Sequence, residues 1–309
     1  MGKYISIMRL DHWIKQIFIA PGWIAAFVLL GSSPSLEVFA STVLSFLSTC
    51  FIASANYTLN EWLDADTDRY HPFKKHRSAV KHHLNYQLVY LQYDILTAIG
   101  LFLASCVHPW LLIMELWLLI MGILYNVRPI RLKDLPYLDV LSESVNNAIR
   151  FLIGWFTIST CYFPPLSIVI GYWLAGAFLM ATKRYAEYQI IQDAELAGKY
   201  RKSFRFYTPQ SLLLSAFFYA MSSVFFIGIF LVKYRLELLL FLPAFIGLFC
   251  YYFHLAFLPD SPAQKPEKLF HEKGLMGYVT FLLIFFSVLM FVHLPFLEHL
   301  SSNELLVIP

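Results

Sequence analysis

The sequence has few charged residues and few cysteines for its length. Asp, Glu, Lys and Arg make up 14% of the 309 residues, whereas soluble globular proteins average about a quarter. Together with 59% hydrophobic residues, this scarcity excludes an ordinary soluble enzyme and indicates a membrane protein. The four cysteines lie in or beside apolar runs without the spacing of metal ligands, so they predict core residues. The net charge of +3 says little by itself, and we expect no nucleic-acid partner.

Internal repeats and low-complexity segments are also lacking, and the chain is instead divided into apolar runs of about 20 residues, the length that crosses a bilayer. The predicted helices lie near residues 14–31, 37–60, 86–107, 109–126, 139–160, 163–184, 210–232, 236–257 and 275–295. The predicted fold class is therefore all-α: a polytopic membrane protein with nine transmembrane helices, in one domain over residues 1–309. The first run follows Lys3 and Arg9 as in a signal peptide, but the many later spans favour an uncleaved helix.

Basic residues are distributed unequally between the two predicted sides of the membrane. Of the 23 Lys and Arg residues, 20 fall in the N-terminal segment or in the loops on that side, including Lys265 and Lys268. Lys233 and Arg235 fall on the other side, and Arg150 lies within a helix. The positive-inside rule then places the N-terminus in the cytoplasm and the C-terminus outside. Some of these residues have a simpler role, which is to set topology or contact anionic lipid.

An acidic segment follows the second apolar run. Residues 60–77 read Asn-Glu-Trp-Leu-Asp-Ala-Asp-Thr-Asp-Arg-Tyr-His-Pro-Phe-Lys-Lys-His-Arg. Asn60, Asp64 and Asp68 are four residues apart, which predicts one helix face. Carboxylates at the mouth of a membrane helix are costly unless something binds them; a divalent cation with a phosphate-bearing substrate would do so. Lys74 and Arg77 are then placed to hold phosphate oxygens. The alternative is a solvated helix end.

Polar residues also interrupt the fifth predicted helix. Glu143, Asn147 and Arg150 occur at positions i, i+4 and i+7, and therefore share one face. Such residues within a span are expensive and are by default functional or mutually paired. We interpret Arg150 as an anion clamp that faces a cavity. The alternative is a structural network in which Glu143 and Arg150 pair with each other.

Three further segments combine basic residues with helix ends. At the end of the sixth predicted helix, Lys183 and Arg184 lie one turn from Glu187, as in a phosphate site or an interfacial ion pair. The loop after the fourth helix contains Arg128, Arg131 and Lys133, which either close over a phosphate or only set topology. Residues 200–209 are basic and enter the seventh helix, where they bind an anion or serve as an interfacial anchor.

The order of the acidic segment resembles a known motif. Asn-Glu-x-x-Asp-x-x-x-Asp is similar to the first aspartate-rich motif of the UbiA superfamily of intramembrane prenyltransferases, with Glu61 in place of the usual Asp. The run His-Pro-Phe-Lys-Lys-His-Arg at 71–77 resembles the decaprenyl-phosphate phosphoribosyltransferase branch of this superfamily. Lys-Arg-Tyr-Ala-Glu at 183–187 and the segment 201–208 are similar to the same branch. Ser78, where this branch usually has Pro, departs from the pattern.

This resemblance implies a UbiA-like helical bundle with a cytoplasm-facing cavity, in a bacterial plasma membrane, and Mg²⁺ as cofactor. The implied metal ligands are Asn60, Glu61, Asp64, Asp68 and Glu187. The implied catalytic residues are Asp64, Asp68, Lys74, Arg77 and Glu187. The residues implied to bind substrate phosphates are Lys15, Lys74, Arg77, Tyr125, Lys133, Arg150, Lys183, Arg184, Arg201, Lys202 and Tyr207.

The expected reaction is transfer of a 5-phosphoribosyl group from phosphoribosyl diphosphate to a polyprenyl phosphate, with release of diphosphate. The alternative within the superfamily moves a prenyl group from a prenyl diphosphate to an aromatic or other acceptor. A more remote alternative is a transporter of a phosphorylated lipid or sugar. Transporters often have internal symmetry and broken helices near the midplane, whereas the acidic segments here lie at helix ends and no repeat is visible.

Overall fold

Long apolar helices form this fold, as the hydrophobic runs predict. The computed structural model describes residues 2–191, 193–234, 236–258, 261–262, 269 and 271–297, and within them it contains helices and no strand. Eight helical stretches in these ranges are long and apolar enough to cross a membrane. The helices that form the body of the bundle are α2 (Ala20–Leu30), α3 (Leu36–Leu63), α6 (Tyr86–Ser105), α7 (Pro109–Asn126), α8 (Leu138–Ile158), α9 (Leu166–Ile191), α11 (Pro209–Tyr234), α12 (Phe241–Ala256) and α14 (Lys273–Phe291).

Each predicted range overlaps one of these helices, with three differences. The range 14–31 divides into the 3₁₀ helix η1 (Leu10–Ile19) and α2, preceded by the short α1 (Gly2–Ile7). Helix α9 continues to Ile191, well beyond its predicted end at 184. Helix α8 is not among the eight apolar stretches; its sequence includes Asp139, Glu143 and Arg150. A ninth crossing, by α8, therefore stays a prediction.

The acidic segment continues from the end of α3 through a one-residue junction. Helix α3 ends at Leu63, and Asp64 (φ −94°, ψ −3°) is the junction with the short α4 (Ala65–Asp68). After it come η2 (Lys74–His76) and α5 (Ser78–Lys81). The Asp64 N–H donates to the Asn60 carbonyl oxygen at 3.0 Å and the Asp68 N–H donates to that of Asp64 at 2.8 Å, so the predicted helical spacing of the three residues is kept through the junction. The carboxylates of Asp64 and Asp68 nevertheless have different partners.

Close contact between α2 and α8 depends on glycine. A Cβ on Gly22 would lie 2.0 Å from the Phe151 carbonyl oxygen, and a Cβ on Gly154 would lie 2.2 Å from that of Ile19. Small residues let the two backbones approach, as is common between membrane helices. This crossing positions η1, which precedes α2, against the polar face of α8.

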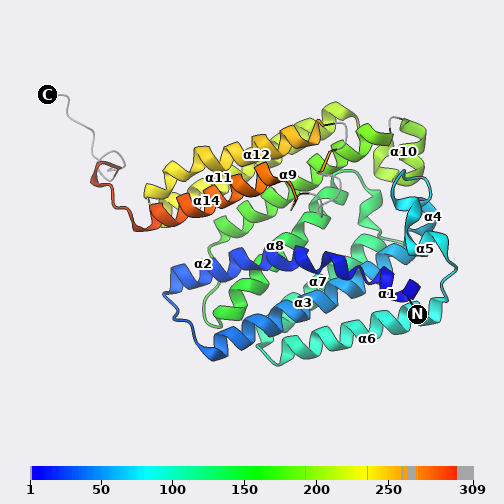
Figure 1. Ribbon diagram of the computed structural model, residues 1–309, viewed down its shortest axis with the longest axis horizontal. Helices are drawn as coiled ribbons and strands as arrows, with labels where there is room; N and C mark the ends of the chain where they lie inside the picture. Colours follow the sequence, from blue (N-terminus) through cyan, green and yellow to red (C-terminus); the bar gives the residue numbers. More distant parts are fainter. Residues whose placement is uncertain are drawn as a thin grey trace.

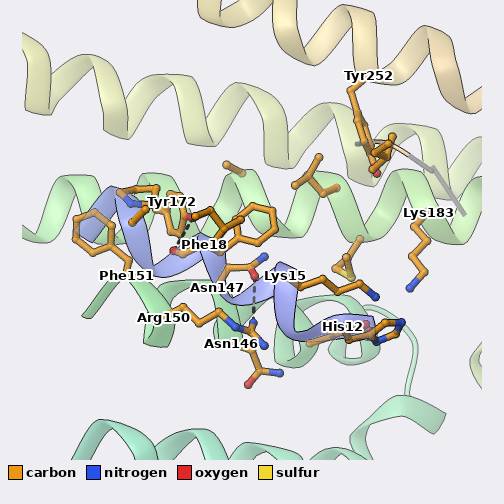
Figure 2. Close-up of a pocket in the computed structure, with 18 of the residues that line it drawn as sticks. His12, Lys15, Phe18, Asn146, Asn147, Arg150, Phe151, Tyr172, Lys183 and Tyr252 are labelled. Carbon is orange, nitrogen blue, oxygen red and sulfur yellow. Dashed lines mark hydrogen bonds between the residues drawn. The ribbon is translucent and has the colours of Figure 1, made fainter. Parts of the chain in front are cut away.

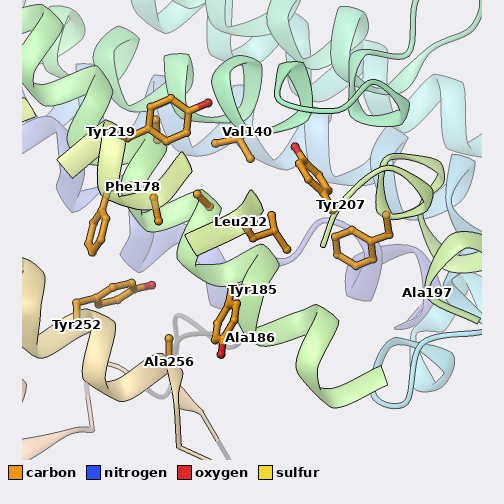
Figure 3. Packing of buried hydrophobic residues seen from close by; sticks show 14 of the residues in the cluster. Val140, Phe178, Tyr185, Ala186, Ala197, Tyr207, Leu212, Tyr219, Tyr252 and Ala256 are labelled. Carbon is orange, nitrogen blue, oxygen red and sulfur yellow. The ribbon is translucent and has the colours of Figure 1, made fainter. Parts of the chain in front are cut away.

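A second packed region joins α8, α9, α11 and α12. Figure 3 shows Phe178, Tyr219, Tyr252 and Leu212 of this cluster, all of them buried. The Phe178 ring lies 4.8 Å from that of Phe249 and 5.9 Å from that of Tyr252, centroid to centroid. Aromatic packing of this kind fixes α9 and so the direction of the polar residues at its end.

The short helices gather at one end of the bundle. Figure 1 shows α4, α5 and α10 (Ala194–Tyr200) together there, with α1 nearby, whereas α14 ends at the opposite end. The side of the membrane that each end faces stays a prediction. Lys265 and Lys268, which contributed to that prediction, lie outside the described residues.

Candidate active site

A cavity of about 1310 Å³ runs between the helices of the bundle. Its walls are apolar over α2, α11, α12 and α14, where Ile24, Phe230, Phe245 and Phe286 are among the lining residues. The acidic segment, the α7–α8 loop and the end of α9 contribute charged side chains to the same cavity. A long apolar group with an anionic end therefore fits its chemistry.

Asp64 is held by two cations of the α7–α8 loop. Its Oδ1 accepts from Lys133 Nζ at 2.5 Å and from Arg131 Nη2 at 2.9 Å, and its Oδ2 accepts from Asn60 Nδ2 at 3.1 Å. Burial raises the pKa of Asp64, but Lys133 and Arg131 outweigh burial and hold it below its usual value. Asp64 is therefore ionised in the folded protein.

Asp68 pairs with a cation of its own segment. Arg77 Nη1 donates to Asp68 Oδ2 at 2.6 Å. Burial raises the pKa of Asp68 above its ordinary value, although Arg77 and Lys74 oppose the effect of burial. Two carboxylates four residues apart thus lie in different electrostatic environments.

His71 shapes the loop that carries Lys74. Its Nδ1 accepts from the backbone N–H of Phe73 at 3.1 Å and of Lys74 at 3.3 Å. Burial, followed by the charge of Lys74, lowers the pKa of His71 to about 3, so its ring is neutral. Lys74 Nζ then reaches α9, where it lies 3.0 Å from Glu187 Oε1, and it also donates to Tyr200 Oη.

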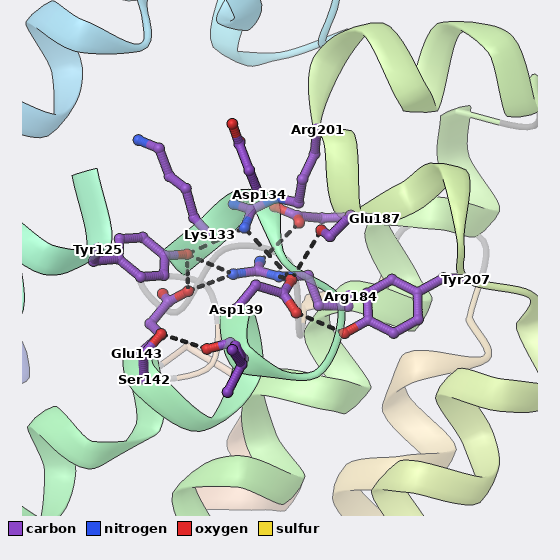
Figure 4. A network of polar contacts seen from close by, with 12 residues as sticks. Tyr125, Lys133, Asp134, Asp139, Ser142, Glu143, Arg184, Glu187, Arg201 and Tyr207 are labelled. Carbon is purple, nitrogen blue, oxygen red and sulfur yellow. Dashed lines mark hydrogen bonds and ion pairs between the residues drawn. The ribbon is translucent and has the colours of Figure 1, made fainter. Parts of the chain in front are cut away.

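Arg184 is the centre of a buried ionic network (Figure 4). Its side chain is 1% exposed; Nη1 donates to Glu187 Oε2 at 2.9 Å and Nε to Asp139 Oδ2 at 3.3 Å. Nη2 donates to Glu143 and, at 3.2 Å, to Tyr125 Oη. Such an array of charge-assisted bonds fixes the groups before a substrate arrives.

Arg201 joins this network from the loop after α10. Its Nη1 donates to Tyr125 Oη at 3.1 Å and lies 3.6 Å from Asp139 Oδ2. Tyr125 in turn donates to Glu143 Oε2 at 2.7 Å. Segments distant in sequence are thereby joined at one end of the cavity, which supplies several preorganised cations for an anionic substrate.

Most of the predicted site residues line this cavity. They are Lys15, Asn60, Glu61, Asp64, Asp68, Lys74, Arg77, Tyr125, Lys133, Arg150, Lys183, Arg184 and Arg201. Glu187 does not line it: the side chain is 2% exposed and lies between Lys74 and Arg184. Lys202 is 57% exposed and lies 3.5 Å from Asp134. Tyr207 donates to Asp139 Oδ1 at 2.6 Å, away from the cavity wall.

Of the ion pairs considered as structural alternatives, one forms and two do not. Glu143 pairs with Arg184, and Arg150, which lies about two turns further along α8, hydrogen-bonds neutral side chains. Glu187 pairs with Lys74 and Arg184, and within the described chain it makes no ion pair with Lys183. The predicted Arg184–Glu187 pair is formed.

The proposed metal ligands fit Mg²⁺ unequally. Asn60, Asp64 and Asp68 present oxygen atoms on the cavity wall, as this cation prefers. Glu61 also lines the cavity but has other partners: it accepts from the Ala79 N–H at 3.4 Å and lies 3.9 Å from Arg9 Nη1. The described residues contain no group of three acidic, His or Cys side chains close enough to bind a metal together. The carboxylates are instead paired with cations, which a metal would displace.

Three residues, Asn126, Tyr200 and Asp139, were not recognised as site residues from the sequence, and Arg131, a candidate for binding phosphate, binds a carboxylate here. Arg131 binds Asp64, and Asn126 Oδ1 accepts from Lys133 Nζ at 2.8 Å. Tyr200 accepts from Lys74, and Asp139 binds Arg184. Asp139 is fully buried, and a lone acidic residue at the start of a membrane helix was the one available signal for it.

Comparison with known proteins assigns the chain to a family. The profile of the UbiA prenyltransferase family matches residues 18–283. The chain belongs to this family. Among curated relatives, it is 28% identical over 215 residues to a protein of Mycolicibacterium smegmatis named decaprenyl-phosphate phosphoribosyltransferase. It is 26% identical over 219 residues to a protein of Corynebacterium glutamicum with the same name. Each match covers 67% of this chain but only 63% and 60% of the respective relatives.

Solved UbiA structures share the fold. A UbiA homologue of Archaeoglobus fulgidus, determined with GPP and Mg²⁺, superposes with a TM-score of 0.69 at 20% identity, over 93% of this chain and 99% of the other. A structure described for digeranylgeranylglyceryl phosphate synthase gives 0.62 at 16% identity, over 94% and 99%. These similarities establish that the helical bundle is a UbiA fold.

Proposed function

We propose that this UbiA family member is a transferase that moves 5-phosphoribosyl from phosphoribosyl diphosphate to a polyprenyl phosphate and releases diphosphate. The observation that carries this proposal is the array of cations at one end of an apolar cavity. Two anionic substrates, one of them a lipid, need such a cavity. The two curated relatives with this activity in their names support the choice of substrates.

The reaction breaks the bond between C1 of the ribose and the diphosphate oxygen, and forms a bond from C1 to an oxygen of the lipid phosphate. Negative charge collects on the departing diphosphate. Lys74, Arg77 and Arg201 line the cavity and would donate to that charge from fixed positions. The attacking phosphate oxygen is already anionic, so the mechanism needs no strong general base.

Asn60, Asp64 and Asp68 are the proposed ligands of Mg²⁺. Glu187 would not bind the metal but would orient Lys74 and Arg184, with which it forms ion pairs. When bound, Mg²⁺ supplies Lewis-acid neutralisation of diphosphate charge. The Mg²⁺ in the solved homologue supports this assignment. Asp64, ionised in the folded protein, has the protonation state that a metal ligand requires.

The second candidate is transfer of a prenyl group to an aromatic or other acceptor. The homologue bound to GPP favours it, since a prenyl diphosphate also combines an apolar chain with diphosphate. Family membership gives no support to the transporter alternative. For either reaction, we propose that the polar end of the cavity opens to the cytoplasm of a bacterial cell, as the distribution of Lys and Arg indicates.

A two-substrate assay separates the candidates. Purified protein in detergent receives Mg²⁺, phosphoribosyl diphosphate and a polyprenyl phosphate, and released diphosphate is measured. We expect release that requires both substrates and stops with EDTA. Release only from a prenyl diphosphate with an aromatic acceptor would contradict the phosphoribosyl proposal and support the second candidate.

A further inference from the structure

Arg150 lies in the cavity with an environment unlike that of the ionic network. Its Nε donates to Gln16 Oε1 at 2.7 Å. Its Nη1 donates to Asn147 Oδ1 at 3.4 Å, and Figure 2 shows Arg150 and Asn147 in the cavity. Both partners are neutral amides, and Gln16 is fully buried. The guanidinium is therefore oriented by its neighbours but not neutralised by them.

The carboxylates in or beside the rest of the cavity already have cationic partners. Asp64, Asp68, Glu143 and Glu187 each form an ion pair with a cation. In the described part of the chain, neither Arg150 nor Lys183 forms an ion pair. Figure 2 shows Lys183 on α9 and Lys15 on η1, both reaching into the cavity that Arg150 lines.

A cation within a membrane bundle without a counter-ion is expensive, so such residues mark binding sites for anions. Arginine is suited to phosphate because its planar fork can donate two parallel hydrogen bonds. Gln16 accepts from the Nε–H of Arg150, and Asn147 accepts from one Nη1–H. The remaining Nη–H groups of Arg150 can therefore donate to a ligand.

Apolar walls next to Arg150 indicate what is attached to that anion. Phe151 follows it on α8, and the Phe151 ring lies 5.4 Å from that of Tyr172. Tyr172 donates to the Phe18 carbonyl oxygen at 3.1 Å, which fixes this wall against η1 (Figure 2). All three side chains line the cavity. An isoprenoid chain fits these surfaces, whereas a ribose with its hydroxyl groups would find few partners there.

We propose that Arg150, with Lys183 and Lys15, forms a separate subsite for the phosphate of the polyprenyl phosphate. The diphosphate-bearing donor then binds the network of Asp64, Arg184 and Arg201. This assignment rests on the proposed phosphoribosyl transfer for the identity of the lipid. It divides the cavity into two anion subsites, so that the two substrates occupy it together without competing for the same cations.

Binding of the lipid alone tests the subsite without requiring turnover. Radiolabelled polyprenyl phosphate and the matching uncharged polyprenol are bound to immobilised full-length protein in detergent, with EDTA and without phosphoribosyl diphosphate. Because hydrogen bonds to charged groups are strong, wild type should prefer the phosphate by about tenfold or more, and Arg150→Gln should lose most of this preference. Arg201→Gln, in the donor subsite, should retain it.

Size-exclusion chromatography would reveal a folding defect in Arg150→Gln. Two further variants test the subsite in that case. Arg150→Lys retains a cation and should keep a preference for phosphate, and Lys183→Gln should reduce it severalfold. An unchanged preference in both Arg150→Gln and Lys183→Gln would overturn the subsite. So would a loss of phosphoribosyl diphosphate binding in Arg150→Gln with lipid binding intact. If the protein prefers polyprenyl phosphate in a manner that depends on Arg150, but releases no diphosphate in the two-substrate assay, the subsite is supported. Only the proposed reaction is then contradicted.

Discussion

The Lys133 ammonium lies 2.5 Å from Asp64 Oδ1, although 69 residues separate them in the chain. The Lys133 side chain is 4% exposed and that of Asp64 13% exposed. This ion pair joins the acidic segment after α3 to the loop before α8. It also holds a proposed metal ligand in its ionised form.

Asp64→Asn should therefore reduce both stability and activity. Removing one partner of a buried pair leaves the other uncompensated, so we expect a loss of about 3 kcal/mol in the free energy of unfolding. Diphosphate release should fall by at least about 100-fold. Thermal unfolding in detergent and the diphosphate assay measure the two effects.

The double variant Asp64→Asn/Lys133→Met distinguishes the two roles. It removes both charges, so part of the lost stability should return. Activity should not return, because the proposed ligand is still missing. Recovered turnover in the double variant would show that Asp64 is only structural.

Lys202 and Tyr207 test which of the predicted phosphate ligands act directly. Neither lines the cavity. Lys202→Gln should leave turnover within about twofold, since an exposed pair contributes little. Tyr207→Phe removes the hydrogen bond to Asp139 and should cost about 1 kcal/mol of stability, with the KM for phosphoribosyl diphosphate unchanged.

Arg201→Gln is the positive control for that comparison, because Arg201 lines the cavity. Its KM for phosphoribosyl diphosphate should rise by about tenfold or more. A larger rise in the KM of Tyr207→Phe than of Arg201→Gln would place Tyr207 in contact with the substrate after all.

His71 should make stability depend on pH. Its pKa of about 3 in the folded protein is below the ordinary value of about 6.5 in the unfolded chain. The unfolded state therefore binds more protons between these values, so stability falls as the pH is lowered from about 6.5 towards 3. We expect a smaller fall in His71→Asn, measured as melting temperature from pH 7 to 4.5.

The same variants test whether His71 positions Lys74. Asn at 71 retains an acceptor for the backbone N–H groups of the loop, whereas Ala does not. Diphosphate release should fall further in His71→Ala than in His71→Asn. The plot of the release rate against pH should have the same inflections near pH 6.5 in both variants as in wild type. An inflection present only in wild type would mean that His71 takes part in proton transfer.

The crossing of α2 and α8 should not tolerate a side chain at Gly154. A Cβ there would lie 2.2 Å from the Ile19 carbonyl oxygen and 2.9 Å from the Trp23 nitrogen. Gly154→Ala should lower the free energy of unfolding by about 1–3 kcal/mol. Gly277→Ala on α14 is the matched control, because nothing lies within 4 Å of its added Cβ. Equal melting temperatures for the two variants would contradict the close packing of α2 on α8.

The sequence by itself determined the class of the protein and much of the site. Apolar runs identify membrane helices because the bilayer imposes a minimum length, and the nine predicted ranges all overlap helices. The segment 60–77 pointed to the UbiA family because its residue types and spacing are local features. The family profile confirms this resemblance.

Only the tertiary structure decided which charges pair. Lys74 meets Glu187 across 113 residues, and Arg184 selects Asp139 and Glu143 from α8. Helical spacing predicts contacts along one helix, such as Arg184 with Glu187, but carries no information on which helix lies opposite. Which helices lie opposite one another depends on packing, such as the close approach at Gly22 and Gly154. For the same reason only the tertiary structure shows that Arg150 has no carboxylate partner among the described residues.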